Sequence, residues 1–232
     1  MQRRDFFRLC AASAAAAGMP AFAVAGATAR RYARALLVDA RGEPLRAASV
    51  PPRRNLIFHY PYTVTPCFLL NLGRPVRGTA RLRTADRRDY EWSGGVGPQR
   101  SIVAYSAICA HQLAYPTREI SFISFRAEAS ARNRHADVIH CCAEHSQYDP
   151  AEGARVVAGP ATQPLAAILL DYEPATDALY AVGTLGGELF DAFFAKYAMR
   201  LTLENGAAER REVTGTAVVT ALEQYCRQQV KC

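Results

Sequence analysis

The sequence predicts a mainly β chain that folds into one modest domain, with a helical segment near its C-terminus. Short β-branched or alternating runs recur along the middle of the chain, and Gly, Pro and Asp separate many of them, as is typical of antiparallel strands. The 232 residues are enough to bury a single core. We expect strands at Ala35–Val38, Phe68–Leu72, Thr79–Arg83, Ser101–Ile108, Ile120–Arg126, Val138–His140, Arg155–Ala158, Ala166–Tyr172 and Ala178–Val182.

The chain changes character after these strands. Apolar residues recur at helical spacing from Glu188, which predicts a helix with a packing face. Between Ala217 and Val230 the sequence fits a strand that runs into a short helix. We therefore expect a β domain over residues 30–185 and a C-terminal extension over residues 186–232. The apolar face of the predicted helix consists of Leu189, Phe190, Phe193, Phe194 and Tyr197.

Residues 1–29 are predicted to be an export signal or an N-terminal membrane anchor. Arg3 and Arg4 precede an uncharged stretch from Leu9 to Ala29, an arrangement that resembles a twin-arginine leader. This route exports folded proteins, so the predicted location is the periplasm. The stretch is just long enough to span a bilayer, and both cleavage and retention as an inner-membrane anchor remain open.

The formal charge of +7 is spread over several arginine runs without interleaved aromatic residues. This distribution argues against a nucleic-acid surface. A basic surface of this kind can orient an acidic redox partner.

Two short motifs carry the chemistry. Cys109-x-His111 follows one strand-like run and Cys142-x-x-His145 follows another, so both lie on loops at strand ends. Each loop offers one thiolate and one imidazole, which is the ligand set of a Rieske 2Fe–2S cluster. Zinc also accepts two Cys and two His, so a structural zinc-binding module is the alternative of a different class.

The surrounding residues resemble the Rieske subunit of arsenite oxidase over roughly residues 60–185. The similar segments are Gly94–Pro98 and Ile102–Cys109 before the first loop, and Ser146–Pro150 with the flap Gly159–Leu165 at the second. The resemblance implies a Rieske-type antiparallel β-sandwich, a cluster-binding subdomain at about residues 100–165, and one 2Fe–2S cluster per chain.

The resemblance also implies roles for residues around the cluster. Ser146 and Tyr148 would donate hydrogen bonds to a bridging sulfide and to a ligand sulfur, which raises the reduction potential. The alternative is that both hydroxyls simply satisfy backbone groups in a turn. Gln112, Leu113 and the flap that begins at Pro160 would shield the cluster.

The chain departs from the wider family at its second loop. Rieske proteins of cytochrome bc complexes tie the two loops with a disulfide, whose positions here are Ala114 and Glu144. A gapless alignment also places Cys141 and Glu144, rather than Cys142 and His145, at the ligand positions. We choose Cys142 and His145, because a carboxylate is a poor iron ligand here and only this pair keeps the Cys-x-x-His spacing.

Four cysteines remain after the two ligands and Cys10 of the leader are set aside. An even number in an oxidising compartment suggests disulfides, and three pairings are open. Adjacent residues of an extended segment face opposite sides, so Cys141 would point away from the iron. We expect Cys67–Cys141 and Cys226–Cys232.

These observations predict an electron-transfer protein without substrate chemistry of its own, because no acid–base pair or nucleophile motif is present. It would be the small subunit or partner of an exported oxidoreductase, working with a larger redox subunit that contains molybdopterin or cytochrome b. It would pass electrons towards cytochrome c. The quinol-oxidising Rieske subunit of a bc-type complex is the alternative, and an oxygenase component is excluded by the short sequence after residue 185.

Overall fold

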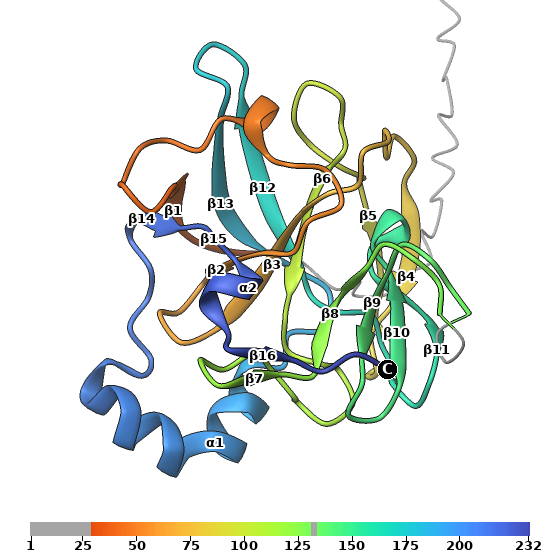
Figure 1. Ribbon diagram of the computed structural model, residues 1–232, viewed down its shortest axis with the longest axis vertical. Helices are drawn as coiled ribbons and strands as arrows, with labels where there is room; N and C mark the ends of the chain where they lie inside the picture. Colours follow the sequence, from red (N-terminus) through yellow and green to blue (C-terminus); the bar gives the residue numbers. More distant parts are fainter. Residues whose placement is uncertain (1–28, 131–133) are drawn as a thin grey trace, which may run out of the picture.

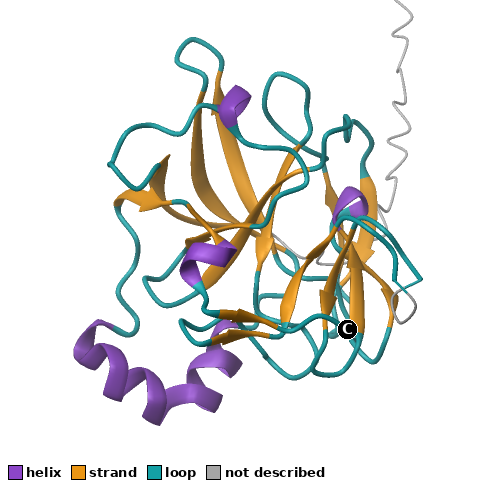
Figure 2. Cartoon of the chain, viewed as in Figure 1, coloured by secondary structure: helices purple, strands orange, loops and turns teal. Residues whose placement is uncertain are grey.

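The protein, described here from a computed structural model that covers residues 29–130 and 134–232, is mainly β, as the sequence predicts (Figure 1 and Figure 2). The expected leader lies outside the described residues, apart from Ala29. None of the helices within these two ranges is long and apolar enough to cross a membrane.

Eight strands form the largest sheet, in the order β14-β1-β13-β12-β6-β3-β2-β15. All neighbours pair antiparallel except β1 and β14, which run parallel. Two strands of the C-terminal extension, β14 and β15, therefore complete the two edges of this sheet. The strands are β1 (Arg30–Val38), β2 (Leu56–His59), β3 (Pro66–Asn71), β6 (Ile102–Ser106), β12 (Ala167–Glu173), β13 (Ala178–Leu185), β14 (Gly215–Val218) and β15 (Thr220–Ala221).

A four-stranded antiparallel sheet, β11-β10-β9-β8, lies beside the large sheet (Figure 1). Two further pairs complete the β structure: β4 with β5, and β7 with β16, where the end of the chain pairs parallel with a strand near the first ligand loop. These strands are β4 (Ala80–Arg83), β5 (Asp89–Trp92), β7 (Ile120–Ser121), β8 (Ile123–Arg126), β9 (Val138–Cys141), β10 (Ser146–Asp149), β11 (Arg155–Ala158) and β16 (Gln228–Gln229).

The main core fills the space between the two sheets. It joins Phe68 and Tyr105 of the large sheet to Ile123 and Ile139 of the small one, and Trp92 of β5 closes one side. All five side chains are buried. Because each buried aromatic or branched side chain contributes roughly 1.5–3 kcal/mol, this core fixes the position of the small sheet and of the loops at its end.

The C-terminal extension contributes a helix as well as strands. Helix α1 (Phe190–Asn205) buries Phe190, Phe193 and Phe194, which confirms the apolar face that its spacing predicts. The predicted strand and short helix are also present, as β14, β15 and α2 (Leu222–Tyr225). Three short 3-10 helices complete the fold: η1 (Ala47–Ser49), η2 (Pro150–Glu152) and η3 (Gly206–Ala208).

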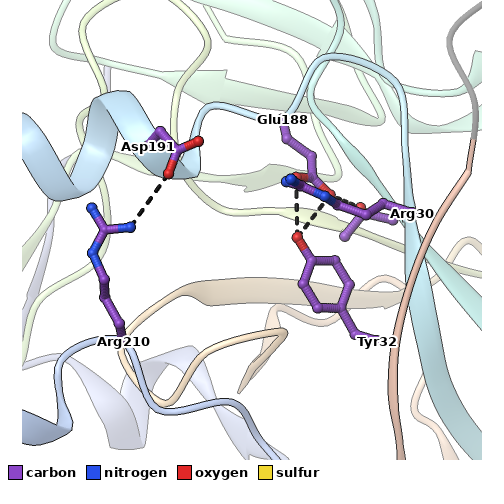
Figure 3. A network of polar contacts seen from close by, with 6 residues as sticks. Arg30, Tyr32, Glu188, Asp191 and Arg210 are labelled. Carbon is purple, nitrogen blue, oxygen red and sulfur yellow. Dashed lines mark hydrogen bonds and ion pairs between the residues drawn. The ribbon is translucent and has the colours of Figure 1, made fainter.

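The start of α1 is anchored by polar contacts of two acidic residues, Glu188 and Asp191 (Figure 3). Glu188 accepts hydrogen bonds from the Tyr32 hydroxyl at 3.1 Å and from Arg30 at 2.5 Å, and Arg210 pairs with Asp191 at 3.3 Å. The arginines are exposed, so each pair contributes modestly. Together they connect the helix to β1 and to the segment after η3.

All nine predicted strands correspond to strands of the structure. The sequence did not indicate β2, β5, β10 or β16. In β5 the alternation is short and strongly charged, and β10 coincides with the residues that were assigned to the second ligand loop.

Candidate metal centre

The second candidate loop is the tight turn between β9 and β10. Cys141 ends β9 and pairs with Ser146 at the start of β10, so residues 142–145 form the turn itself. Side chains alternate along a strand, and Ile139 and Cys141 therefore both face the main core. The face on which Cys141 lies is thus set by the strand that precedes it.

The first candidate loop follows β6 and brings Cys109 to the same core. Cys109 is buried, and its sulfur accepts hydrogen bonds from the backbone N–H groups of His111 and Gln112. The sulfur of Cys141 accepts from Ala143 and Glu144 in the same way. Both cysteines thus sit at the start of equivalent turns in which the amides two and three residues later point at the sulfur.

The two buried cysteines influence each other's protonation. The interaction between their side chains lowers the pKa of Cys109 to about 5 and raises that of Cys141. The Tyr148 hydroxyl and the two backbone amides support the Cys109 thiolate. Two adjacent thiolates repel each other in a buried site, so losing the second proton requires a cation that binds both sulfurs.

His111 lies two residues after Cys109. The residue is half-buried, but its Nδ1 atom is fully buried and has no hydrogen-bond partner within the described part of the chain. A buried nitrogen without a partner is costly. Its lone pair suits a metal ligand, because coordination would satisfy this atom.

Tyr148 touches Cys109 directly. Its hydroxyl oxygen lies 3.3 Å from the Cys109 sulfur and accepts a hydrogen bond from the amide of Ala110 at 3.1 Å. Since that amide supplies its own proton to the oxygen, the hydroxyl proton is free to point at the sulfur. Burial raises the pKa of Tyr148 and keeps it protonated. The contact agrees with the donor role expected for this residue.

Ser146 has a different partner. Its fully buried hydroxyl accepts a hydrogen bond from the amide of Ala161 at 3.2 Å and so holds the flap that begins at Gly159 and Pro160. At Gly159 (φ +86°) an added Cβ would lie 2.5 Å from the carbonyl oxygen of His145. The flap therefore approaches the second turn closely only because residue 159 is glycine.

Cys142 and His145, the predicted second ligand pair, are placed elsewhere. Cys142 forms a disulfide with Cys232, so its sulfur is not a thiolate and does not lie beside Cys109. His145 is exposed with φ +58° and groups with His140 and Cys232, their ligand atoms all within 4.8 Å of one another. The strand alternation that puts Cys141 in the core puts the next residues on the other side.

The disulfide pairings also differ from those expected. Cys67, Cys141 and Cys226 are free and buried. Cys67 lies in the second apolar cluster, on the other face of the large sheet, whereas Cys141 lies in the main core. This separation rules out the predicted Cys67–Cys141 bond in this fold, and Cys232 pairs with Cys142 instead of Cys226.

The C-terminal extension holds the first turn as well. Lys196 and Tyr197 of α1 donate to the carbonyl oxygens of Gln112 at 2.5 Å and Leu113 at 3.1 Å, and Tyr197 also packs edge-on against Tyr115. Leu113 adopts φ +60°, so its carbonyl is turned out of the usual direction. The sequence indicated the apolar face of α1 but not these polar contacts.

Three donors in this arrangement fit a 2Fe–2S cluster: the sulfurs of Cys109 and Cys141 and the unpartnered Nδ1 of His111. Two signals in the sequence, which were interpreted above in the opposite way, could have identified Cys141. Ser146 and Tyr148 stand at the family spacing from Cys141 without a gap, and the alternation from Ile139 predicts the same face. At the family's fourth position, three residues after this cysteine, stands Glu144.

Comparison with known proteins gives a structural likeness. No protein-family model matches the chain. Among solved structures, the chain is similar to the soluble domain of the Rieske protein II (soxF) from Sulfolobus acidocaldarius, with 25% sequence identity and a TM-score of 0.47 over 68% of this chain and 82% of that chain. With a TM-score below 0.5, this likeness by itself assigns neither family nor function.

Proposed function

We propose that this chain is an electron-transfer protein that holds a Rieske-type 2Fe–2S cluster between the two turns. The observation that carries the proposal is that Cys109 and Cys141 are both fully buried in the same core, with the buried, unpartnered Nδ1 of His111 two residues after Cys109. When bound, the cluster would accept and release one electron. The chain's own residues position it, tune it and limit its contact with water.

The thiolates and the imidazole have separate tasks. Cys109 and Cys141 would hold one iron from the buried side, and the amides of the two turns would stabilise the negative charge on their sulfurs. His111 would hold the other iron through Nδ1. Because the rest of His111 is half-buried, its ring connects the buried centre to the protein surface, where a partner docks.

The fourth donor comes from the second turn. His145 is grouped with His140 and Cys232, while Glu144 stands three residues after Cys141 and donates its backbone N–H to that sulfur. We therefore infer that Glu144 takes the place of the second imidazole as the fourth ligand, although a carboxylate is a poorer iron ligand than the histidine of a Rieske centre. A carboxylate adds a negative charge that imidazole lacks, which lowers the potential relative to a centre with two neutral histidines.

Tyr148 and the flap act on the cluster's potential and its exposure. The Tyr148 hydroxyl donates to the Cys109 sulfur, and such a bond is stronger when the cluster is reduced and more negative. Ser146 holds the flap over the second turn through Ala161. The Tyr148 contact would favour the reduced state, and the Ser146 contact would help to exclude water. Neither residue would bind the cluster itself.

The wider setting is part of the proposal. The arginine pair and the uncharged stretch before Ala29 support export to the periplasm, with the leader either cleaved or retained as an anchor. There the protein would serve as the small subunit or partner of a larger oxidoreductase and pass electrons towards cytochrome c. The basic surface would speed encounter with an acidic partner.

Metal and sulfide analysis tests the proposal directly. The purified full chain should contain two irons and two acid-labile sulfides per chain and show the paramagnetic spectrum of a reduced, mixed-ligand 2Fe–2S centre. A Cys109→Ser variant should lose both iron and sulfide. Stoichiometric zinc without labile sulfide would overturn the proposal in favour of a structural zinc module.

A further inference from the structure

The outer face of β9 carries a second cluster of metal-binding side chains. Strand alternation directs His140 away from the face on which its neighbours Ile139 and Cys141 meet the main core. On this side His145, at the end of the turn, and Cys232, at the end of the chain, come together with His140. Figure 1 shows the C-terminus against the strands of the small sheet.

His140 lacks an ordinary hydrogen-bond partner. The residue is fully buried, and its two ring nitrogens contact only the sulfur of Cys232, at 3.5 and 3.6 Å, among the contacts of the described residues. Directly opposite, in β8, Ser124 has a buried hydroxyl with no partner in the same part of the chain. A buried imidazole beside an unsatisfied hydroxyl is a costly arrangement, and a bound ion would relieve it.

The disulfide is the obstacle to metal binding and also the means to control it. Cys142 and Cys232 are bonded to each other, and a disulfide sulfur is a weak ligand compared with a thiolate. The Cα atoms of the two cysteines lie 5.7 Å apart, so both sulfurs can bind one ion with little backbone movement. Reduction would therefore give two thiolates beside two imidazoles.

We propose that His140, His145, Cys142 and Cys232 form a second metal site, distinct from the Cys109–Cys141 centre, that binds a tetrahedral divalent cation of the zinc type only after the disulfide is reduced. Two thiolates and two imidazoles are a common ligand set for zinc. Cys232 lies at the end of the chain, whereas Cys142 and His145 belong to the second turn. Binding of the cation would therefore depend on the redox state of the disulfide and would hold these two segments together.

The chemistry balances with a dithiol as reductant. The dithiol passes two electrons and two protons to the Cys142–Cys232 bond, which becomes two thiols while the dithiol becomes a disulfide. The cation then replaces the two thiol protons.

The surrounding charges are compatible with such a site. Arg126 lies 3.7 Å from the Cys142 sulfur and donates to the carbonyl of Val230 at 2.5 Å. A divalent cation with two thiolates is neutral overall, so the guanidinium does not face a net positive charge. It also stabilises the thiolates before the cation arrives.

Zinc binding by the full chain in its two redox states tests the proposal. The protein as isolated, and the same protein reduced with dithiothreitol and desalted without air, are dialysed against zinc alone, and zinc and iron are measured in the same samples. We expect one additional zinc per reduced chain, an affinity at least 100-fold above that of the oxidised protein, and unchanged iron. Cobalt in place of zinc should show thiolate-to-metal charge-transfer bands.

Variants identify the ligands. Cys232→Ser and His140→Gln should each lower the zinc affinity of the reduced protein at least tenfold, whereas Cys226→Ser, a cysteine of the same segment, should not. If His140→Gln does not fold, His145→Asn, at an exposed position, tests an imidazole ligand in its place. Equal zinc binding by both redox states, unchanged binding in Cys232→Ser, or zinc uptake matched by iron loss would each overturn the proposal.

Discussion

Cys142 is bonded to Cys232, the last residue of the chain, while its neighbour Cys141 faces the main core that also contains Cys109. The side chains of these adjacent residues thus lie on opposite sides of the small sheet. On one side lies the candidate cluster site, and on the other a covalent bond attaches the C-terminal extension to the same turn. The extension also holds the first turn through Tyr197 and Leu113.

The first prediction assigns the two neighbouring cysteines. Cys141→Ser should abolish iron and labile-sulfide binding, because it removes one of the two core sulfurs. Cys142→Ser should keep the cluster and lower the free energy of unfolding by roughly 2–4 kcal/mol, because it opens a loop that spans 90 residues. Metal analysis and thermal unfolding measure the two effects, with Cys226→Ser as the control. Cluster retention in Cys141→Ser with loss in Cys142→Ser would restore the register chosen from the sequence.

The second prediction concerns the fourth ligand. Glu144→Ala should weaken or abolish cluster binding and change the spectrum of the reduced centre, because it removes the side chain at the fourth ligand position. His145→Ala should leave iron content and spectrum unchanged, since His145 is grouped with His140 and Cys232. The two substitutions are neighbours in one exposed turn, so each is the other's control. The reverse result would place His145 at the cluster and remove it from the second site.

The difference between expectation and structure at this turn has a simple physical origin. The Cys-x-x-His spacing is a local pattern, and it favours Cys142 and His145. The side of the sheet on which a cysteine lies depends on strand alternation from Ile139, on the pairing of Cys141 with Ser146, and on Tyr148 in the next strand. These relationships depend on the pairing of β9 with β10. In the sequence their trace is the spacing from Cys141 to Ser146 and Tyr148, which matches the resembled Rieske subunits without a gap.

Other features were beyond the sequence alone. The mainly β fold and the apolar face of α1 follow from residue periodicity, and the structure confirms both. The Cys142–Cys232 bond follows from β16 pairing with β7, which brings the end of the chain back to the small sheet. No local pattern near Cys232 indicates that return, so the predicted pairing with Cys226 used proximity in sequence instead.

The third prediction concerns the reduction potential. Tyr148→Phe should lower it by tens of mV, because the hydroxyl lies 3.3 Å from the Cys109 sulfur and stabilises the more negative reduced state. For one electron, about 59 mV corresponds to about 1.4 kcal/mol. A redox titration followed by the reduced-state spectrum measures the shift.

The matched control is Tyr105→Phe. Tyr105 is also fully buried, but its hydroxyl donates to the carbonyl of Pro150 at 2.7 Å rather than to a candidate ligand. This variant should lose stability without a comparable change in potential. Equal potentials in Tyr148→Phe and the unmodified protein would limit Tyr148 to the backbone contact with Ala110.

The fourth prediction concerns the contact between α1 and the first turn. Tyr197→Phe removes the hydrogen bond to the Leu113 carbonyl and should lower the free energy of unfolding by roughly 0.5–1.5 kcal/mol. The cluster should also be lost faster on dilution into chelator, because the carbonyl next to the turn is released. Tyr180→Phe, whose hydroxyl contacts Glu173 on the far part of the large sheet, should leave the rate of iron loss unchanged. Equal rates for all three proteins would show that α1 does not support the turn.

The last prediction concerns acid stability. Burial, with a smaller contribution from Arg118, lowers the pKa of His59 to about 4, whereas an unfolded histidine titrates near 6.5. The unfolded chain therefore binds more protons than the folded one between these values. The contribution of neutral His59 to stability is complete above pH 6.5 and is lost as the pH falls towards 4, by roughly 2 kcal/mol between pH 7 and pH 5.

Denaturant unfolding at a series of pH values measures this effect. The free energy of unfolding should fall less steeply with decreasing pH in His59→Gln than in the unmodified protein. Tyr225→Phe, which removes the hydroxyl 3.3 Å from His59 but keeps the imidazole, should retain the original slope. A slope unchanged in His59→Gln would mean that His59 titrates alike in the folded and unfolded states.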